Sequence, residues 1–149
     1  MRRPIAALLV LPALLALVAG CAAGGGQGCQ EVTIEVRAVA TVSAEDPVPL
    51  TATIQADGAP VPGADVAFYV YHESTAGEDE GGAVTANAET DAEGVATVTY
   101  TGSADLPAFS DQVVTGYSAA LVSSEGTYCR SRSEVASLDV PCAGFACTG

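Results

Sequence analysis

The sequence predicts an all-β protein: an immunoglobulin-like antiparallel β-sandwich of about seven strands, following a cleaved signal peptide. Three observations lead to this prediction. Between residues 29 and 141, apolar residues recur with a period of two in short runs. Clusters of Gly, Pro and Asp separate those runs, and no stretch after the apolar start has a convincing helical period. We expect one domain over 29–141 and a C-terminal tail over 142–149.

Residues 1–20 are expected to be a signal peptide. A basic start precedes an apolar run over residues 5–19, which is short for a membrane span. Residues 17–21, Leu-Val-Ala-Gly-Cys, resemble the bacterial lipobox. The resemblance implies cleavage before Cys21 and lipidation of its thiol. The alternative is an ordinary secretory signal that ends beside a chance cysteine.

Lipidation of Cys21 would hold the protein on the outer face of a membrane, because two or three acyl chains give stable attachment. The location would be the cell membrane or the outer membrane, on the extracytoplasmic side. Residues 21–28 contain the lipidated Cys and a glycine-rich stretch, which we interpret as a flexible tether.

The charge balance excludes one class of partner. The chain has no lysine, and removal of residues 1–20 would leave three arginines against 18 acidic side chains, a formal charge near −15. Such a surface repels nucleic acid, so we expect no nucleic-acid partner. The acidity favours a soluble monomer.

Four cysteines remain after Cys21, an even number that predicts two disulfides in an exported protein. Cys29 precedes the first expected strand and Cys129 the last. Those strands can run side by side in an immunoglobulin-like sandwich, so we expect Cys29–Cys129 and a small loop closed by Cys142–Cys147. Three pairings are possible. Because the chain has no CxxC motif and His72 is its only histidine, we expect no metal site and no cofactor.

The strands are predicted in order along the chain. Val32, Ile34 and Val36 alternate with charged or polar residues, which is typical of a strand with one buried face. The strand over 112–122 has two possible inward faces, Val113/Tyr117/Leu121 or Val114/Ala120/Val122. The seven expected strands lie near residues 31–37, 50–56, 66–71, 84–88, 96–100, 112–122 and 136–140.

Turns and loops are predicted between them. Residues 57–63 are dense in turn formers, and Asp91 to Gly94 fits a tight turn in which Asp binds its own backbone and Gly supplies positive φ. We expect loops over 72–82 and 102–111.

Residues 58–68 and 90–99 carry a family resemblance. They match the patterns G-x-P-V-x-G-x-x-V-x-F and T-D-x-x-G-x-A-x-V. In these motifs the region over 31–140 resembles the bacterial immunoglobulin-like domains of invasin and intimin type. The resemblance implies the fold and is nearly silent on function. In that family the domains usually occur in tandem as stalks of adhesins. Carboxypeptidase-regulatory and transthyretin-like sandwiches share parts of the pattern and are the alternative fold.

Two candidate binding features follow. Tyr69 and Tyr71 should point outward from their strand and could form a recognition patch for a protein or a sugar. Alternatively, tyrosine simply suits strands, or the acidic loop covers them. Glu78, Asp79 and Glu80 could hold a cation; the alternative is a solvated acidic loop.

No catalytic residues are predicted. Asp91 and Glu93 belong to a tight turn, and no G-x-S-x-G motif is present. We expect a non-enzymatic binding or structural module of the cell envelope, whose partner is an envelope protein or polysaccharide. The alternatives are an accessory subunit or inhibitor of an envelope enzyme or transporter, and an ion or ligand sensor that uses the acidic loop.

Overall fold

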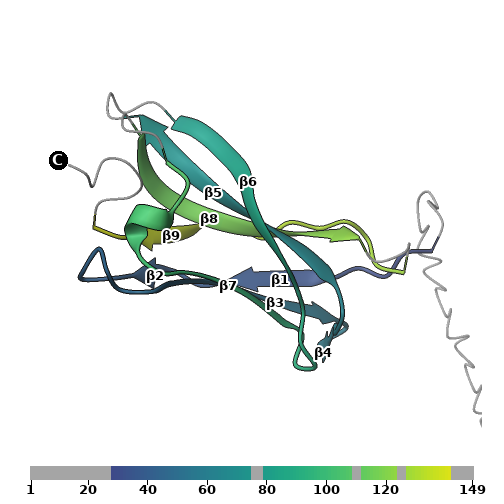
Figure 1. Ribbon diagram of the computed structural model, residues 1–149. Helices are drawn as coiled ribbons and strands as arrows, with labels where there is room; N and C mark the ends of the chain where they lie inside the picture. The colour runs from purple at the N-terminus through teal and green to yellow at the C-terminus, as the bar shows by residue number, and fades with distance from the viewer. Residues whose placement is uncertain (1–27, 75–78, 109–111, 124–126, 142–149) are drawn as a thin grey trace, which may run out of the picture.

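The computed structural model describes residues 28–74, 79–108, 112–123 and 127–141. These residues form two β-sheets that face each other across one apolar core (Figure 1). The prediction of an all-β sandwich of antiparallel sheets is confirmed.

The smaller sheet is built around β3 (Val48–Ala56). β1 (Thr33–Val36) pairs along one side of it. β7 (Val95–Tyr100) and the two-residue β4 (Ala59–Pro60) pair along its other side. All of these pairings are antiparallel.

The larger sheet has the order β2-β9-β8-β5-β6. Its central members are β5 (Asp65–Ser74) and β8 (Gln112–Ser123), and β6 (Asp79–Glu89) pairs with β5. β2 (Val39–Ala40) pairs in parallel with β9 (Ala136–Asp139). Thus the chain leaves the smaller sheet after β1 and joins the larger one at β2.

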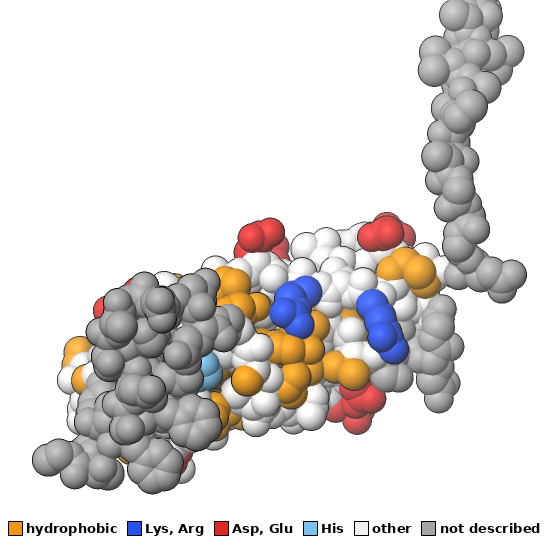
Figure 2. Space-filling view, turned by 90° about the horizontal axis from the view of Figure 1, so that it is seen from above, with side chains coloured by type: hydrophobic (Ala, Val, Ile, Leu, Met, Phe, Trp, Pro, Cys, Tyr) orange, Lys and Arg blue, Asp and Glu red, His pale blue; other side chains and the backbone are white. Residues whose placement is uncertain are grey.

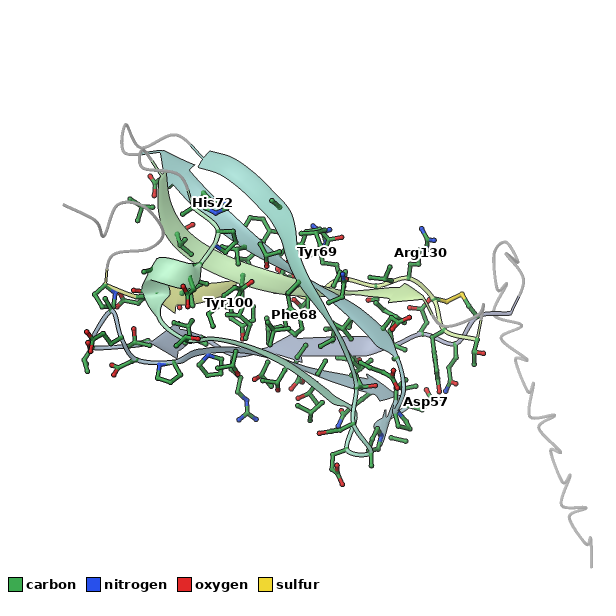
Figure 3. All side chains as sticks on the ribbon, in the orientation of Figure 1. Asp57, Phe68, Tyr69, His72, Tyr100 and Arg130 are labelled. Carbon is green, nitrogen blue, oxygen red and sulfur yellow. A yellow bond between two sulfur atoms is a disulfide. The ribbon has the colours of Figure 1, made fainter. Side chains whose placement is uncertain are left out.

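The core lies between the inward faces of both sheets. Its members alternate along the strands, as the period of two predicted, and Figure 3 shows Phe68 pointing into the space between the sheets. The central fully buried residues are Val48, Leu50, Ala52 and Ile54 from β3, Val66, Phe68 and Val70 from β5, and Tyr117 and Ala119 from β8.

The predicted loop over residues 72–82 is wrong. β5 runs on to Ser74 and β6 begins at Asp79, so most of this segment belongs to a long hairpin. Glycines disfavour strands in general. Here Gly82 is tolerated because it faces Tyr71, whose ring lies 2.9 Å from the position that a Cβ of residue 82 would occupy. The expected short strand at 84–88 is therefore the end of an 11-residue strand.

A β-bulge explains why the inward face of β8 was ambiguous. Tyr71 pairs with Gly116, whereas the next residue, His72, pairs with Val114, so Thr115 has no partner in β5. The bulge changes the phase of the alternation. Val114 points inward before it, and Tyr117, Ala119 and Leu121 point inward after it. Each proposed face was right over only part of its length.

Tyr117 connects the two sheets. Its side chain is fully buried, and its hydroxyl donates to the carbonyl oxygen of Arg37 at 2.7 Å. The same oxygen lies 3.2 Å from the Thr51 carbonyl and accepts from the Arg37 N–H at 3.3 Å. Burial raises the pKa of the Tyr117 hydroxyl, because the phenolate would lose its hydration. This tyrosine fixes the backbone where the chain passes from β1 to β2.

The Cys29–Cys129 disulfide is present, with a Cα–Cα distance of 4.9 Å. Beside it, Gln30 and Tyr128 form a parallel bridge, and the Cys129 N–H donates to the Gln30 carbonyl at 2.9 Å. The predicted Cys29–Cys129 pairing is thus confirmed. The first and last strands themselves do not pair with each other: β1 pairs with β3, and β9 lies between β2 and β8 in the other sheet.

The predicted turns are also found. Gly94 has φ 76°, and the Asp91 carboxylate accepts from the N–H groups of Glu93 and Val95. Asp57 and Gly58 both have positive φ and join β3 to β4. The expected loop over 102–111 contains a short 3-10 helix, η1 (Ser103–Asp105). Within the described ranges, no helix is long and apolar enough to span a bilayer.

Candidate functional site

Tyr69 and Tyr71 project from the outer face of the larger sheet, opposite Phe68 and Val70. The prediction that they point outward therefore agrees with the structure. Both side chains are nevertheless half-buried. The reason is a third residue, Arg132, which lies 61 positions from Tyr71 along the chain.

Arg132 covers the tyrosine pair. Its backbone forms a bridge to Ala120 of β8, and its side chain reaches across that small residue to β5. The guanidinium carbon lies 3.8 Å from the centroid of the Tyr69 ring, and Nη1 donates to the Tyr71 hydroxyl at 3.3 Å. A cation–π contact of this kind contributes about 0.5–1 kcal/mol at an exposed position. The guanidinium is thereby held against the two tyrosines on the outer face of the sheet.

Tyr71 is fixed from two further sides. Its hydroxyl lies 3.2 Å from the Ser118 Oγ, and its ring occupies the space beside Gly82. We name the set Tyr69, Tyr71, Ser118 and Arg132 the tyrosine–arginine cluster. Its donors and aromatic rings come from three separate stretches of sequence, and the pairing of β5 with β8 brings them together.

A groove of about 370 Å³ adjoins this cluster. The described residues that line it are Tyr69, Ala120, Leu121, Val122, Arg130, Ser131 and Arg132. Figure 2 shows two basic side chains among hydrophobic ones on this face, and Figure 3 places Arg130 toward the end of the sandwich that carries the disulfide. Among the described residues that line this outer-face groove, none bears a carboxylate.

A second groove, of about 310 Å³, lies where the two sheets meet. Residues 34–37 line one side of it and residues 133–136 the other. It contains Arg37, but also Glu35 and Glu134. We call it the seam groove.

Sequence reasoning missed Arg130, Arg132 and Ser118. A signal was present, because two of the five arginines stand two residues apart in a chain without lysine. Residues two apart in an extended segment lie on one face. That spacing could have indicated a positively charged patch, but not which tyrosines it would cover.

Several predicted site residues lie outside the described part of the chain: Cys21, Glu78, Cys142 and Cys147. Asp79 and Glu80 lie on β6 instead of in a loop. The lipid site, the second disulfide and the cation site therefore stay predictions. Across the described ranges, no three His, Cys, Asp or Glu side chains are grouped as a metal site would require.

His72, the only histidine, is buried. Its Nε2 donates to the carbonyl oxygen of Pro107. Asp91 uses its carboxylate to hold the turn that joins β6 to β7. Both residues thus have structural roles in the described fold.

No protein-family model matches the sequence, and no curated protein is similar to it. The resemblance to invasin and intimin domains accordingly stays a prediction from two short motifs.

Proposed function

We propose that this protein is a lipid-anchored lipoprotein of the bacterial cell envelope that displays one immunoglobulin-like domain as a binding module and does not catalyse a reaction. The observation that carries the binding role is the tyrosine–arginine cluster beside the outer-face groove. Tyrosine and arginine are among the residue types most enriched in binding hot spots, since they combine apolar area with directed hydrogen bonds.

Two features of the sequence support the anchored location. The apolar run over residues 5–19 is followed directly by the lipobox-like residues 17–21. An intramolecular disulfide between Cys29 and Cys129 is typical of proteins outside the cytoplasm. An envelope protein or polysaccharide is the expected partner.

Metabolic labelling with a fatty acid tests the anchor. We expect the wild-type chain to incorporate the label and to fractionate with membranes, and Cys21→Ala to lose both properties, because Cys21 carries the acceptor thiol. The matched control is Cys142→Ala with Cys147→Ala, which removes two other cysteines and should keep the label. Equal labelling of the wild type and Cys21→Ala would contradict the proposal.

A further inference from the structure

The arginines of the described chain are distributed unevenly. Two of the three, Arg130 and Arg132, line the outer-face groove, and the third, Arg37, lines the seam groove. The rest of the protein is strongly acidic. The outer-face groove therefore concentrates positive charge on a surface whose net charge has the opposite sign.

Both guanidinium groups have donors available for a ligand. A guanidinium carries five N–H donors in a planar fork. Arg132 donates from Nη1 to the Tyr71 hydroxyl, and one face of its guanidinium contacts the Tyr69 ring. Arg130 is exposed, and it has no hydrogen bond or ion pair to any residue of the described ranges. It is thus the stronger candidate for direct contact with a ligand.

The spacing of the two arginines suits an oxyanion. They are two residues apart in an extended segment beside β8, which separates their Cα atoms by roughly 7 Å. Side chains as long as arginine can converge from that distance on one carboxylate or phosphate. Guanidinium groups bind such groups in a bidentate geometry.

The size of the groove and the net charge restrict the ligand further. A volume of about 370 Å³ lies within the range of small-molecule sites. A long polyanion would meet the repulsion of the surrounding acidic surface. A small ligand with one anionic group would avoid most of it.

We infer that the outer-face groove binds a small ligand through a carboxylate or phosphate group. Arg130 and Arg132 are the donors, and Tyr69 and Ala120 contact the remainder of the ligand. This inference deepens the proposed binding function, on which it rests, by assigning the ligand class.

Arginine-selective ¹⁵N labelling of the full chain, purified from membranes in neutral detergent, tests the inference. Single Arg→Gln variants assign the Nε–Hε signals in the NMR spectrum. D-glucuronate and glycerol 3-phosphate are the anionic probes, and D-glucose and glycerol are their neutral counterparts. We expect the anionic probes to shift the Arg130 and Arg132 signals in a saturable manner, and the neutral probes to leave them in place.

The matched pair of variants is Arg130→Gln and Arg37→Gln, which remove equal charge from the two grooves. Arg130→Gln should weaken binding by about tenfold or more, because it removes a charge-assisted hydrogen bond, whereas Arg37→Gln should change the affinity by less than about twofold. Thermal melting of both variants checks that the fold is intact. Binding of only one anionic probe would support the inference and identify the anion.

Three results would overturn the inference: no shift with either anion, equal shifts with the neutral probes, or equal loss of binding in both variants. The fatty-acid labelling experiment does not involve the groove. Failure here with normal labelling of Cys21 would therefore remove the ligand assignment and leave the anchored display module in place.

Discussion

The outer-face groove and the seam groove have similar volumes, about 370 and 310 Å³, but different charge. The described lining of the first contains two arginines and no carboxylate. In the second, Arg37 shares the lining with Glu35 and Glu134. Size alone therefore does not distinguish a binding groove from a gap between two sheets. The difference in charge does.

The same stretch of chain lines both grooves. Residues 130–132 contribute to the outer face and residues 133–136 to the seam. In the seam, residues 34–37, which belong to β1 or directly follow it, line the groove opposite this stretch and contribute one acid and one base. On the outer face, β5 and β8 contribute uncharged side chains. The charge of each groove thus depends on which distant strands the topology places beside residues 130–136.

The largest expected effect comes from the covalent link next to Arg130. Replacing both Cys29 and Cys129 with Ser should lower the free energy of unfolding by about 4–5 kcal/mol, because the disulfide closes a loop whose ends are 100 residues apart. Urea unfolding measures the change. Adding reductant to the wild type should reproduce it, and a loss below about 1 kcal/mol would mean that noncovalent pairing alone holds the two ends together.

A smaller effect is expected at Tyr117, whose hydroxyl binds the backbone of Arg37, a residue that lines the seam groove. Tyr117→Phe should cost about 1–3 kcal/mol, because it leaves the part-buried carbonyl groups of Arg37 and Thr51 without the hydroxyl. The stability advantage of the wild type should also shrink as the pH rises above about 10. The sign follows from the raised pKa: the folded state holds the phenol proton more tightly than the unfolded state, so stability is lost as the pH rises through the folded pKa.

Denaturant melts of wild type and Tyr117→Phe at pH 8 and pH 11 compare the two states. The unfolding midpoint of the wild type should move toward that of the variant at the higher pH. If the unfolding midpoints of wild type and variant differ by the same amount at both pH values, Tyr117 titrates as it does in the unfolded chain.

The smallest effect on stability should follow removal of the acids from the seam groove. Glu35→Gln with Glu134→Gln should change the free energy of unfolding by less than about 0.5 kcal/mol, since both side chains are exposed. The Arg37 signal should then respond to D-glucuronate, because no nearby carboxylate competes. If the Arg37 signal does not shift, the difference in charge does not explain why the two grooves differ in binding.

The parts of the fold that depend on local sequence were predictable. Period-two alternation located the seven main strands, and the side chain of Asp91 and the flexibility of Gly94 identified their turn. The Cys29–Cys129 pair followed from a topological argument about the first and last strands. In each case the signal lies in residues that are close together or in a general property of the fold.

What the sequence did not reveal depends on pairing between distant segments. The bulge at Thr115 reverses the alternation of β8, which no single period can describe. In the β5–β6 hairpin Gly82 pairs with Tyr71, and the Tyr71 ring occupies the space that a side chain at residue 82 would need. The contact of Arg132 with the two tyrosines requires β8 to lie between them, and nothing local to residue 132 indicates that arrangement.

The disulfide also determines how mechanical tension would pass through the molecule. Cys29 is the residue at which the N-terminal segment reaches the sandwich, and Cys129 is the neighbour of Arg130. A pull between that segment and a ligand held at Arg130 would run through one S–S bond and a single peptide linkage. The strands between the two cysteines would lie off this path, so a tethered domain could stay folded under a load that would otherwise unzip its sheets.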